Sequence, residues 1–476
     1  MTHGRTTAVM GLLLLAVTIP PGTLVRDDPT ISIVAAGMAN RDSLKVDVIT
    51  TGADSLPGEA PAIATLAGWL GATMVHAVLP LIGMPSRFAW VIDLPSGTVR
   101  VGSIAIGTFS PVRPFTDNIQ FSVEVTLRRG LHATMDRRGG TILLPTVIVP
   151  GLLNMLGPPN ERVLNGFRRL GYSDVGPAPT LFWFSYPASG RTLPESASNL
   201  AKYVRQVVLT KAYAVRVNVV GYSSGGLLPR WNVDYDVDGW GTLVNRLALV
   251  GVPNEGAVFA YLVEHSLLYR PFAAWGRSPL AAANRPTFPF WRARSSEPWT
   301  MPPDGGNPIL AQLNSRPIPD GVRVYLYYSE LAPGPSRTVQ GFTGSLTRGA
   351  ATYAPGDGVV LAASVLGRSI NGTGEIAGLT RHVALTVNLG SVRHVFLFPK
   401  AATLVASAMQ DGFQTRLASA SPAAAMSARF LPQPPHGHLG DDGSSHMMPL
   451  LFGIVLNPGG YPCRSVLHLL WRGDPC

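Results

Sequence analysis

The chain has 476 residues, of which 46% are hydrophobic and only 14% are charged. Globular domains average about 25% charged residues, so much of this surface is neutral or apolar. The net charge of +10 comes almost entirely from arginine, but no basic run is longer than two residues, and we expect no nucleic-acid partner. Glycine and proline follow no period, which excludes a collagen-like chain, and two cysteines exclude a disulfide-rich scaffold.

Residues 1–28 have the pattern of an export signal or an N-terminal anchor. His3 and Arg5 precede an apolar stretch, residues 8–19, that is shorter than a membrane-spanning helix. We therefore expect an exported protein that is secreted, periplasmic or associated with the cell envelope. An uncleaved anchor that holds the protein at the membrane is the alternative.

Residues 29–140 predict a β-rich N-terminal region. Short alternating or β-branched runs read as strands at Ile31–Ala35, Leu44–Thr51, Phe88–Ile92, Thr98–Ile106 and Asn118–Leu127. Between them, residues 60–86 carry no Asp, Glu, Lys or Arg. We predict that this apolar segment is a buried or membrane-facing helix packed on the strands. A membrane span is the alternative, which its glycines and Pro80 disfavour.

Residues 141–412 change to a pattern of continuous apolar runs that alternate with helical spacing. The apolar runs are Thr146–Val149, Leu181–Tyr186, Val215–Val220, Leu247–Val252, Val322–Tyr328 and Val383–Leu389. Leu193–Leu209 and Leu227–Trp231 have helical spacing. Strands buried on both faces are continuously apolar, so the pattern predicts an α/β fold with a mostly parallel sheet and helices on both faces.

Two segments depart from this rhythm. Residues 254–318 are rich in aromatic residues and proline, and we predict that they form a cap inserted over the carboxyl edge of the sheet. Residues 413–476 read as a linker and C-terminal tail. In an oxidising compartment, Cys463 and Cys476 would close a small loop through a disulfide, and two free thiols are the alternative.

The strongest chemical signal is the sequence Gly221-Tyr-Ser-Ser-Gly-Gly226, which lies between a predicted strand and a predicted helix. This is a G-x-S-x-G nucleophile elbow in its required context. Gly221 and Gly225 leave room for the tight turn. Ser223 is the predicted nucleophile, because the motif needs a glycine two residues before the serine. Ser223 has Gly221 there, whereas Ser224 has Tyr222.

A serine hydroxyl needs a base, and the base needs a carboxylate to orient it. Asp357 lies between two glycines after a predicted strand, and an ordinary turn aspartate is the alternative. His394 follows the last predicted strand, whereas His382 precedes it. Catalytic groups gather at the carboxyl ends of parallel strands, so we predict His394 as the general base.

The oxyanion that forms during acyl transfer needs backbone N–H donors. One donor is predicted at Ser224, the residue after the nucleophile. The other is predicted at Leu152, because the strand Thr146–Val149 ends in Pro150-Gly151 and glycine permits close backbone approach. A plain turn at this place is the alternative.

These motifs carry a resemblance. Thr146-Val-Ile-Val-Pro-Gly-Leu152, the elbow, Arg246-Leu-Ala-Leu-Val-Gly-Val-Pro-Asn-Glu-Gly256 and Gly356-Asp-Gly-Val-Val360 resemble the α/β-hydrolase superfamily and, more narrowly, the lecithin:cholesterol acyltransferase-like lipases. The likeness covers about residues 141–410 and implies a Ser223/Asp357/His394 triad acting on acyl esters of lipids. Tyr222 stands where that family usually has histidine, and Val359 where threonine is common.

Three functions follow as hypotheses. The first is a lipase or esterase, the second is a lipid O-acyltransferase that passes the acyl group to an alcohol, and the third is a non-catalytic binding protein with a hydrolase fold. The expected partner is a lipid or another acyl ester, with peripheral contact to a membrane as an addition. No HExxH motif and no zinc-like Cys/His spacing occurs, so we predict no metal and no cofactor.

Overall fold

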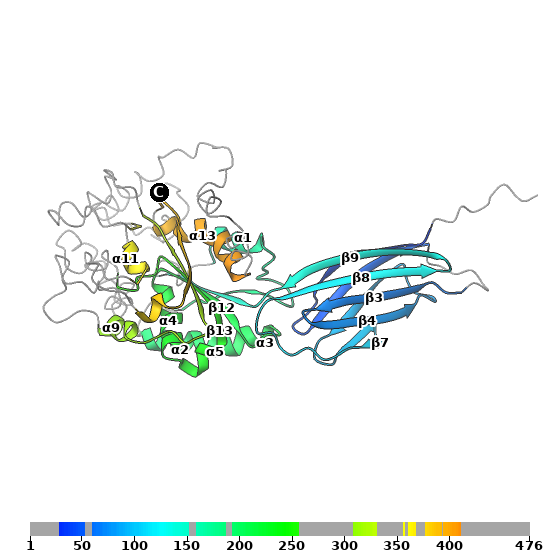
Figure 1. Ribbon diagram of the computed structural model, residues 1–476, viewed down its shortest axis with the longest axis horizontal. Coiled ribbons are helices and arrows are strands. Elements are labelled where there is room, and N and C mark those ends of the chain that lie inside the picture. Colours follow the sequence, from blue (N-terminus) through cyan, green and yellow to red (C-terminus); the bar gives the residue numbers. More distant parts are fainter. Residues whose placement is uncertain are drawn as a thin grey trace, which may run out of the picture. The chain divides into compact units, whose positions relative to one another are not determined.

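The computed structural model describes residues 28–52, 60–151, 159–186, 193–256, 308–330, 356–357, 360–367, 377–392 and 394–410. The chain divides into two compact units (Figure 1). Unit 1 comprises Met1–Gly37, Lys45–Ser110 and Phe121–Gly140, and unit 2 comprises Met38–Leu44, Pro111–Gln120 and Thr141–Cys476. The predicted signal segment up to residue 27, Leu152, cap residues 257–307 and the tail with both cysteines lie outside the described residues.

Unit 1 is built from strands in two sheets. Their bounds are β1 Thr30–Met38, β2 Ser43–Thr51, β3 Ile63–Leu70, β4 Thr73–Pro80, β5 Arg87–Asp93, β6 Thr98–Val101, β7 Ile104–Thr108, β8 Ile119–Arg129 and β9 His132–Ile142. One sheet has the order β1-β2-β5-β6-β7 and the other β4-β3-β8-β9. Side chains alternate between a buried and a solvent-facing side, as in β5, where Phe88, Trp90 and Ile92 are buried.

The helix predicted within residues 60–86 is wrong. The segment forms an antiparallel hairpin of β3 and β4 that turns at Gly71, whose φ is 58°. Leu66 and Leu70 of β3 are buried, whereas Ile63 and Trp69 are exposed. The burial alternates with the strand period, but both sets of residues are apolar. Hydropathy therefore concealed the period of two that a half-buried strand normally displays.

Two further expectations in unit 1 need correction. The run Thr98–Ile106 is not one strand, because Gly102 takes a φ of 58° and separates β6 from β7. Strand β9 was not predicted at all. It carries Asp136, Arg137 and Arg138 with few buried positions, so its sequence lacks an apolar alternation.

Unit 2 contains a six-stranded sheet in the order β11-β10-β12-β13-β14-β15, and all five neighbouring pairs are parallel. The strands are β10 Thr146–Val149, β11 Leu181–Trp183, β12 Val217–Tyr222, β13 Val244–Val250, β14 Arg323–Tyr328 and β15 Val383–Asn388. Strands β10, β12 and β13 are buried at every position. The predicted α/β fold with a parallel sheet is confirmed, and these strands are apolar throughout because both faces are covered.

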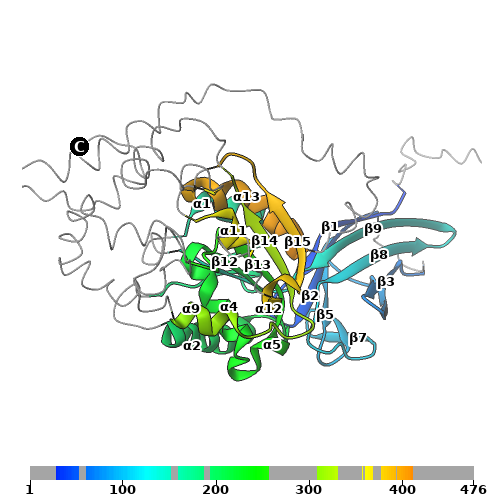
Figure 2. The same ribbon diagram turned by 60° about the vertical axis from the view of Figure 1, so that its left-hand side comes forward.

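Helices cover both faces of this sheet (Figure 2). The helices are α1 Glu161–Arg168, α2 Leu193–Tyr203, α3 Leu209–Lys211, α4 Leu227–Asp234, α5 Trp240–Leu243, α9 Pro308–Asn314, α11 Ala362–Val365, α12 Ala377–Thr380 and α13 His394–Met409. The predicted helix Leu193–Leu209 changes to a π-helical turn at Val204–Val208. Among the described helices, none has both the length and the apolar composition of a membrane span.

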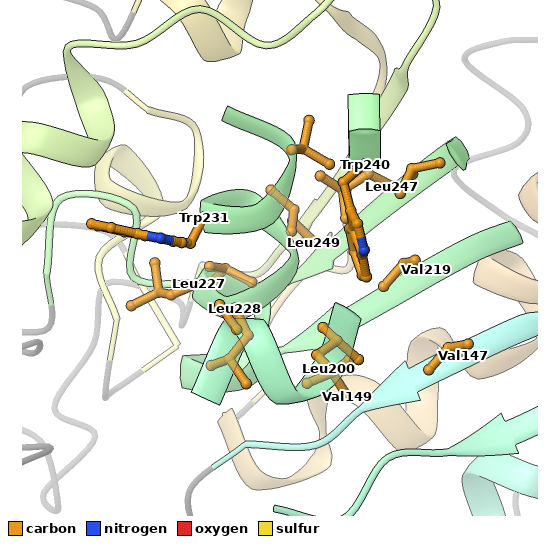
Figure 3. Packing of buried hydrophobic residues seen from close by; sticks show 14 of the residues in the cluster. Val147, Val149, Leu200, Val219, Leu227, Leu228, Trp231, Trp240, Leu247 and Leu249 are labelled. Atoms are coloured by element: carbon orange, nitrogen blue, oxygen red, sulfur yellow. The ribbon is translucent and has the colours of Figure 1, made fainter. Parts of the chain in front are cut away.

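Alternate residues of each strand enter two separate hydrophobic clusters. Val219 of β12 and Leu247 of β13 pack with α2, α4 and α5 on one face, where Trp240 is fully buried (Figure 3). Val220 and Ala248 pack with α1 and α13 on the other face. This two-sided burial holds the carboxyl ends of the strands rigidly, and the turn that follows β12 is therefore well positioned.

Candidate active site

Ser223 lies in a strained turn between β12 and α4. It is one of three non-glycine residues with positive φ among the described residues, at 53°. Such a backbone costs about 1–3 kcal/mol and is retained where the surrounding structure enforces it. A Cβ on Gly221 would collide with Gly226, and one on Gly225 with the carbonyl oxygen of Pro150. The elbow therefore needs glycine at both predicted positions.

The structure brings together the three side chains predicted as a triad. Nε2 of His394 lies 2.8 Å from Oγ of Ser223, and Nδ1 of His394 lies 2.6 Å from Oδ2 of Asp357. All three side chains are buried, with Asp357 only 2% exposed. Both distances lie within hydrogen-bond range, so the arrangement can carry a proton from the serine to the imidazole and stabilise the resulting cation.

The carboxylate of Asp357 is fixed by its own loop. Its Oδ1 accepts a hydrogen bond of 2.8 Å from the backbone N–H of Val360, which leaves Oδ2 to face the imidazole. Its backbone oxygen accepts a 3.0 Å hydrogen bond from the backbone N–H of His394. The acid and the base are thus joined through both side chain and backbone, which limits their relative movement.

His394 is the first residue of α13, after the carboxyl end of β15. His382 lies before the other end of this strand, where its Nε2 is 4.0 Å from an oxygen of the exposed Asp320. Asp234, another acidic residue downstream of the elbow, is buried in an ion pair with Arg230. Of these histidines and acids, His394 and Asp357 are the two that lie at Ser223.

The predicted oxyanion donors are only partly described. Ser224 is buried directly after the nucleophile, and Leu152 lies outside the described residues. Gly151, the residue before Leu152, is buried and close to Ser223. A Cβ added to Gly151 would lie 2.6 Å from the Cβ of Ser223. The Tyr186 hydroxyl donates a 3.0 Å hydrogen bond to the carbonyl oxygen of Pro150 and so fixes this turn.

A buried polar network behind the elbow was not predicted. The guanidinium of Arg230, in α4, donates hydrogen bonds of 3.0 and 3.1 Å to the side-chain oxygens of Asn254 and Asn314. It also donates to Oδ2 of Asp234 at 3.1 Å. Burial raises the pKa of Asp234 to about 6, although Arg230 opposes the shift. The one sequence signal was the spacing of four residues between Arg230 and Asp234 in α4.

This network holds together segments that lie far apart in the chain. Asn254 also donates 2.7 Å from its amide to the carbonyl oxygen of Val365, and the Ser364 hydroxyl accepts a 2.9 Å bond from the backbone N–H of Glu255. Asn254 precedes residues 257–307 and Asn314 follows them. Arg230 thus connects the helix after the nucleophile to both ends of that stretch.

No protein-family model matches the chain, and no curated protein matches its sequence. Among solved structures, the mature lipase BlEst2 of Bacillus licheniformis is similar, with 13% identity over 56% of this chain and 91% of the lipase, and a TM-score of 0.38. Phospholipase PlaB of Legionella pneumophila has 16% identity over 47% of this chain, with a TM-score of 0.32, and the match spans 45% of the phospholipase. The product of gene lin2722 of Listeria innocua has 12% identity over 55% of this chain and 89% of its own, with a TM-score of 0.31.

Unit 2 has the α/β-hydrolase fold. The parallel sheet covered on both faces, the serine with positive φ at the end of β12 and the helix that follows it are features of this chain that define the class. Within the described ranges, no group of three His, Cys, Asp or Glu side chains is arranged to hold a metal ion.

Proposed function

We propose that this protein is a serine hydrolase that cleaves acyl esters of lipids. The observation that carries the proposal is the continuous chain of contacts from Oγ of Ser223 through His394 to Asp357, at 2.8 and 2.6 Å. Geometry of this kind is the requirement for activating a serine, whose hydroxyl is a weak nucleophile without an adjacent base.

In the proposed reaction, Oγ of Ser223 attacks the ester carbonyl while Nε2 of His394 takes its proton. Asp357 stabilises the imidazolium that forms. The tetrahedral oxyanion is held by backbone N–H groups, for which Ser224 and Leu152 remain our candidates. The imidazolium then gives its proton to the departing alcohol, and the acyl group stays on the serine as an ester.

The acyl-enzyme is next attacked by water, which His394 deprotonates. The imidazolium then returns this proton to Oγ of Ser223 as the acyl bond breaks, and the products are a fatty acid and the free serine. An acceptor alcohol in place of water would make the protein an O-acyltransferase through the same groups. A labelled phospholipid distinguishes the two reactions. We expect labelled fatty acid as the main product, whereas a new labelled ester with an added alcohol would favour the acyltransferase.

A fluorophosphonate probe tests the serine chemistry, because it reacts only with an activated serine. We expect the wild-type protein to be labelled and the Ser223→Ala variant not to be. Ser224→Ala is the control, since it removes the neighbouring hydroxyl and keeps the backbone N–H. Absence of wild-type labelling, or equal labelling of Ser223→Ala, would contradict the proposed catalytic role of Ser223.

Contact with a lipid surface is part of the proposal. Trp69 and Met74 are cross-strand neighbours on the hairpin of unit 1 and are 50% and 54% exposed. Ile63 and Val78 are exposed on the same face. Several exposed apolar side chains on one face of a hairpin favour an apolar partner, and a half-exposed tryptophan is typical of membrane interfaces.

Flotation with phosphatidylcholine vesicles tests this contact in the Ser223→Ala background, where no lipid is consumed. We expect Trp69→Ser/Met74→Ser to lose most vesicle binding. Val175→Ser removes another exposed apolar residue, in unit 2, and should bind as the parent does. Equal binding of all three proteins would remove lipid contact from the proposal.

Export is also proposed, on the apolar segment of residues 8–19 and the basic residue before it. Expression of the full chain with fractionation of cells and medium tests it. We expect the protein outside the cytoplasm, and deletion of residues 1–28 should retain it inside.

A further inference from the structure

Tyr222 lies between the nucleophile turn and the base. It is the last residue of β12, immediately before Ser223, and is buried. Its hydroxyl donates a 2.6 Å hydrogen bond to the backbone carbonyl oxygen of His394. Its ring stacks on the imidazole with 5.3 Å between centroids and 23° between planes. Phe398 lies against the tyrosine ring at 5.4 Å.

This contact completes the support of His394. The backbone N–H of the first residue of a helix has no hydrogen-bond acceptor within the helix. Here the backbone N–H of His394 is bonded to the backbone oxygen of Asp357, and its carbonyl is bonded to Tyr222. The backbone is therefore held on both sides of the Cα that carries the imidazole. Since Tyr222 adjoins Ser223, one short segment sets both reacting groups.

The chemistry of the tyrosine suits this role. Burial, together with the negative charge of Asp357, raises the pKa of Tyr222 above its usual range, so the hydroxyl remains a neutral donor. The ring face lies within about 6 Å of the imidazole, a distance at which an aromatic ring attracts a cation. The stack therefore favours the imidazolium, which exists only after the serine has lost its proton.

We infer that Tyr222 is a positioning residue that holds the His394 imidazole in line with Ser223 and supports its protonated form. The inference rests on the proposed serine hydrolase function. It also gives a role to the residue at which this elbow departs from the histidine of the family it resembles.

Two substitutions separate the hydroxyl from the ring. Tyr222→Phe keeps the stack and removes the hydrogen bond, and we expect kcat to fall about tenfold with KM unchanged. Tyr222→Leu also removes the ring, and kcat should fall by about a further fivefold. A loss confined to kcat is expected because the tyrosine acts on the base and not on substrate binding.

Tyr327→Phe is the matched control. Tyr327 is a buried tyrosine of β14. Its hydroxyl donates a 3.5 Å hydrogen bond to the backbone oxygen of Leu404, which lies in α13, the helix that begins at His394. Tyr327→Phe also removes one tyrosine hydroxyl that is bonded to a backbone oxygen of this helix, but that hydroxyl does not contact His394. We expect Tyr327→Phe to keep wild-type kcat even where its Tm falls as far as that of Tyr222→Phe. Equal kcat values in Tyr222→Phe and the wild type would overturn the inference.

A second readout needs no turnover. The proton between Nδ1 of His394 and Asp357 should give a strongly deshielded NMR signal, identified by its loss in His394→Gln. In Tyr222→Phe we expect faster exchange of this proton with solvent than in the wild type or Tyr327→Phe. Identical exchange in all three proteins overturns the inference. If the wild type hydrolyses no ester and takes no fluorophosphonate, the proposed function fails, and proton exchange still decides whether Tyr222 holds the imidazole.

Discussion

Gly251 and His394 are packed so closely that a Cβ atom on the glycine would lie 3.2 Å from Cε1 of the imidazole. The same atom would lie 3.3 Å from Oδ2 of Asp357 and 2.8 Å from a methyl group of Leu397. Gly251 follows β13 directly and has a φ of 57°. Its missing side chain is therefore what allows the acid and the base to meet at the end of the sheet.

Gly251→Ala should impair activity beyond its effect on stability. The positive φ alone costs about 1–2 kcal/mol in an alanine, and the crowding displaces the imidazole or the carboxylate. We expect kcat to fall by about tenfold or more. Gly171→Ala is the control, because its φ is 86° with open space around the added Cβ. It should lose similar stability and keep its activity, and a Gly251→Ala variant with full activity would contradict the expectation.

Gly151→Ala tests the other side of the serine. The added Cβ would lie 2.6 Å from Cβ of Ser223 and 3.2 Å from its Oγ, so the serine or the Pro150-Gly151 turn must move. We expect fluorophosphonate labelling to slow by about tenfold or more. Gly37→Ala places a Cβ in open space in unit 1 and should label at the wild-type rate. An unchanged rate in Gly151→Ala would mean that the turn yields without affecting the nucleophile.

Arg230→Met tests the buried network behind the elbow. The change leaves a buried carboxylate on Asp234 and removes the donor to both Asn254 and Asn314, so we expect a loss of about 3–5 kcal/mol in the free energy of unfolding. Urea denaturation measures it. Arg168→Met breaks the exposed ion pairs of Arg168 with Glu161 and Asp174 and should cost less than about 1 kcal/mol. Similar losses in the two variants would argue that the network contributes little.

Because the pKa of Asp234 is raised in the folded state, we expect the free energy of unfolding to depend on pH. The carboxyl keeps its proton to about pH 6 in the folded state, whereas its ordinary value is 3.8. Between these values the folded state binds more protons, so the free energy of unfolding decreases as the pH rises and levels off above about pH 6. Urea midpoints measured from pH 4 to pH 7 should show this decrease in the wild type. Asp234→Asn should show a smaller decrease, and an equal one would assign it to other groups.

The sequence predicted unit 2 better than unit 1, for a physical reason. The strands β10, β12 and β13 are buried on both faces, so their unbroken apolar runs are unambiguous once helices alternate with them. In unit 1, the hairpin of β3 and β4 is apolar on its exposed face as well. Trp69 and Leu70 are both apolar but differ in burial, and only the packing of the folded sheet decides which side faces the core.

In the candidate site, too, some residues were predictable from a local sequence pattern and others were not. Ser223 was recognisable because a tight strand-to-helix turn imposes glycines at fixed local spacing. Asp357 and His394 were chosen by their order and their place after strands, and no local rule states that they meet a serine up to 171 positions away. Tyr222 was noted only as a departure from a motif, since its partner is a backbone oxygen that a sequence does not display.

The amino-acid pattern was enough to predict the class of fold of unit 2 and the place of the elbow, because both depend on periodicity and on short-range steric rules. Three features became visible only in the folded protein: the hairpin of residues 63–80, the support of His394 by Tyr222 and Gly251, and the network around Arg230. The support of His394 and the Arg230 network depend on contacts between segments that are distant in the chain, and the hairpin is completed by its pairing with the distant strand β8. Their energy comes from burial and hydrogen bonding that exist only after the sheet and its helices have packed.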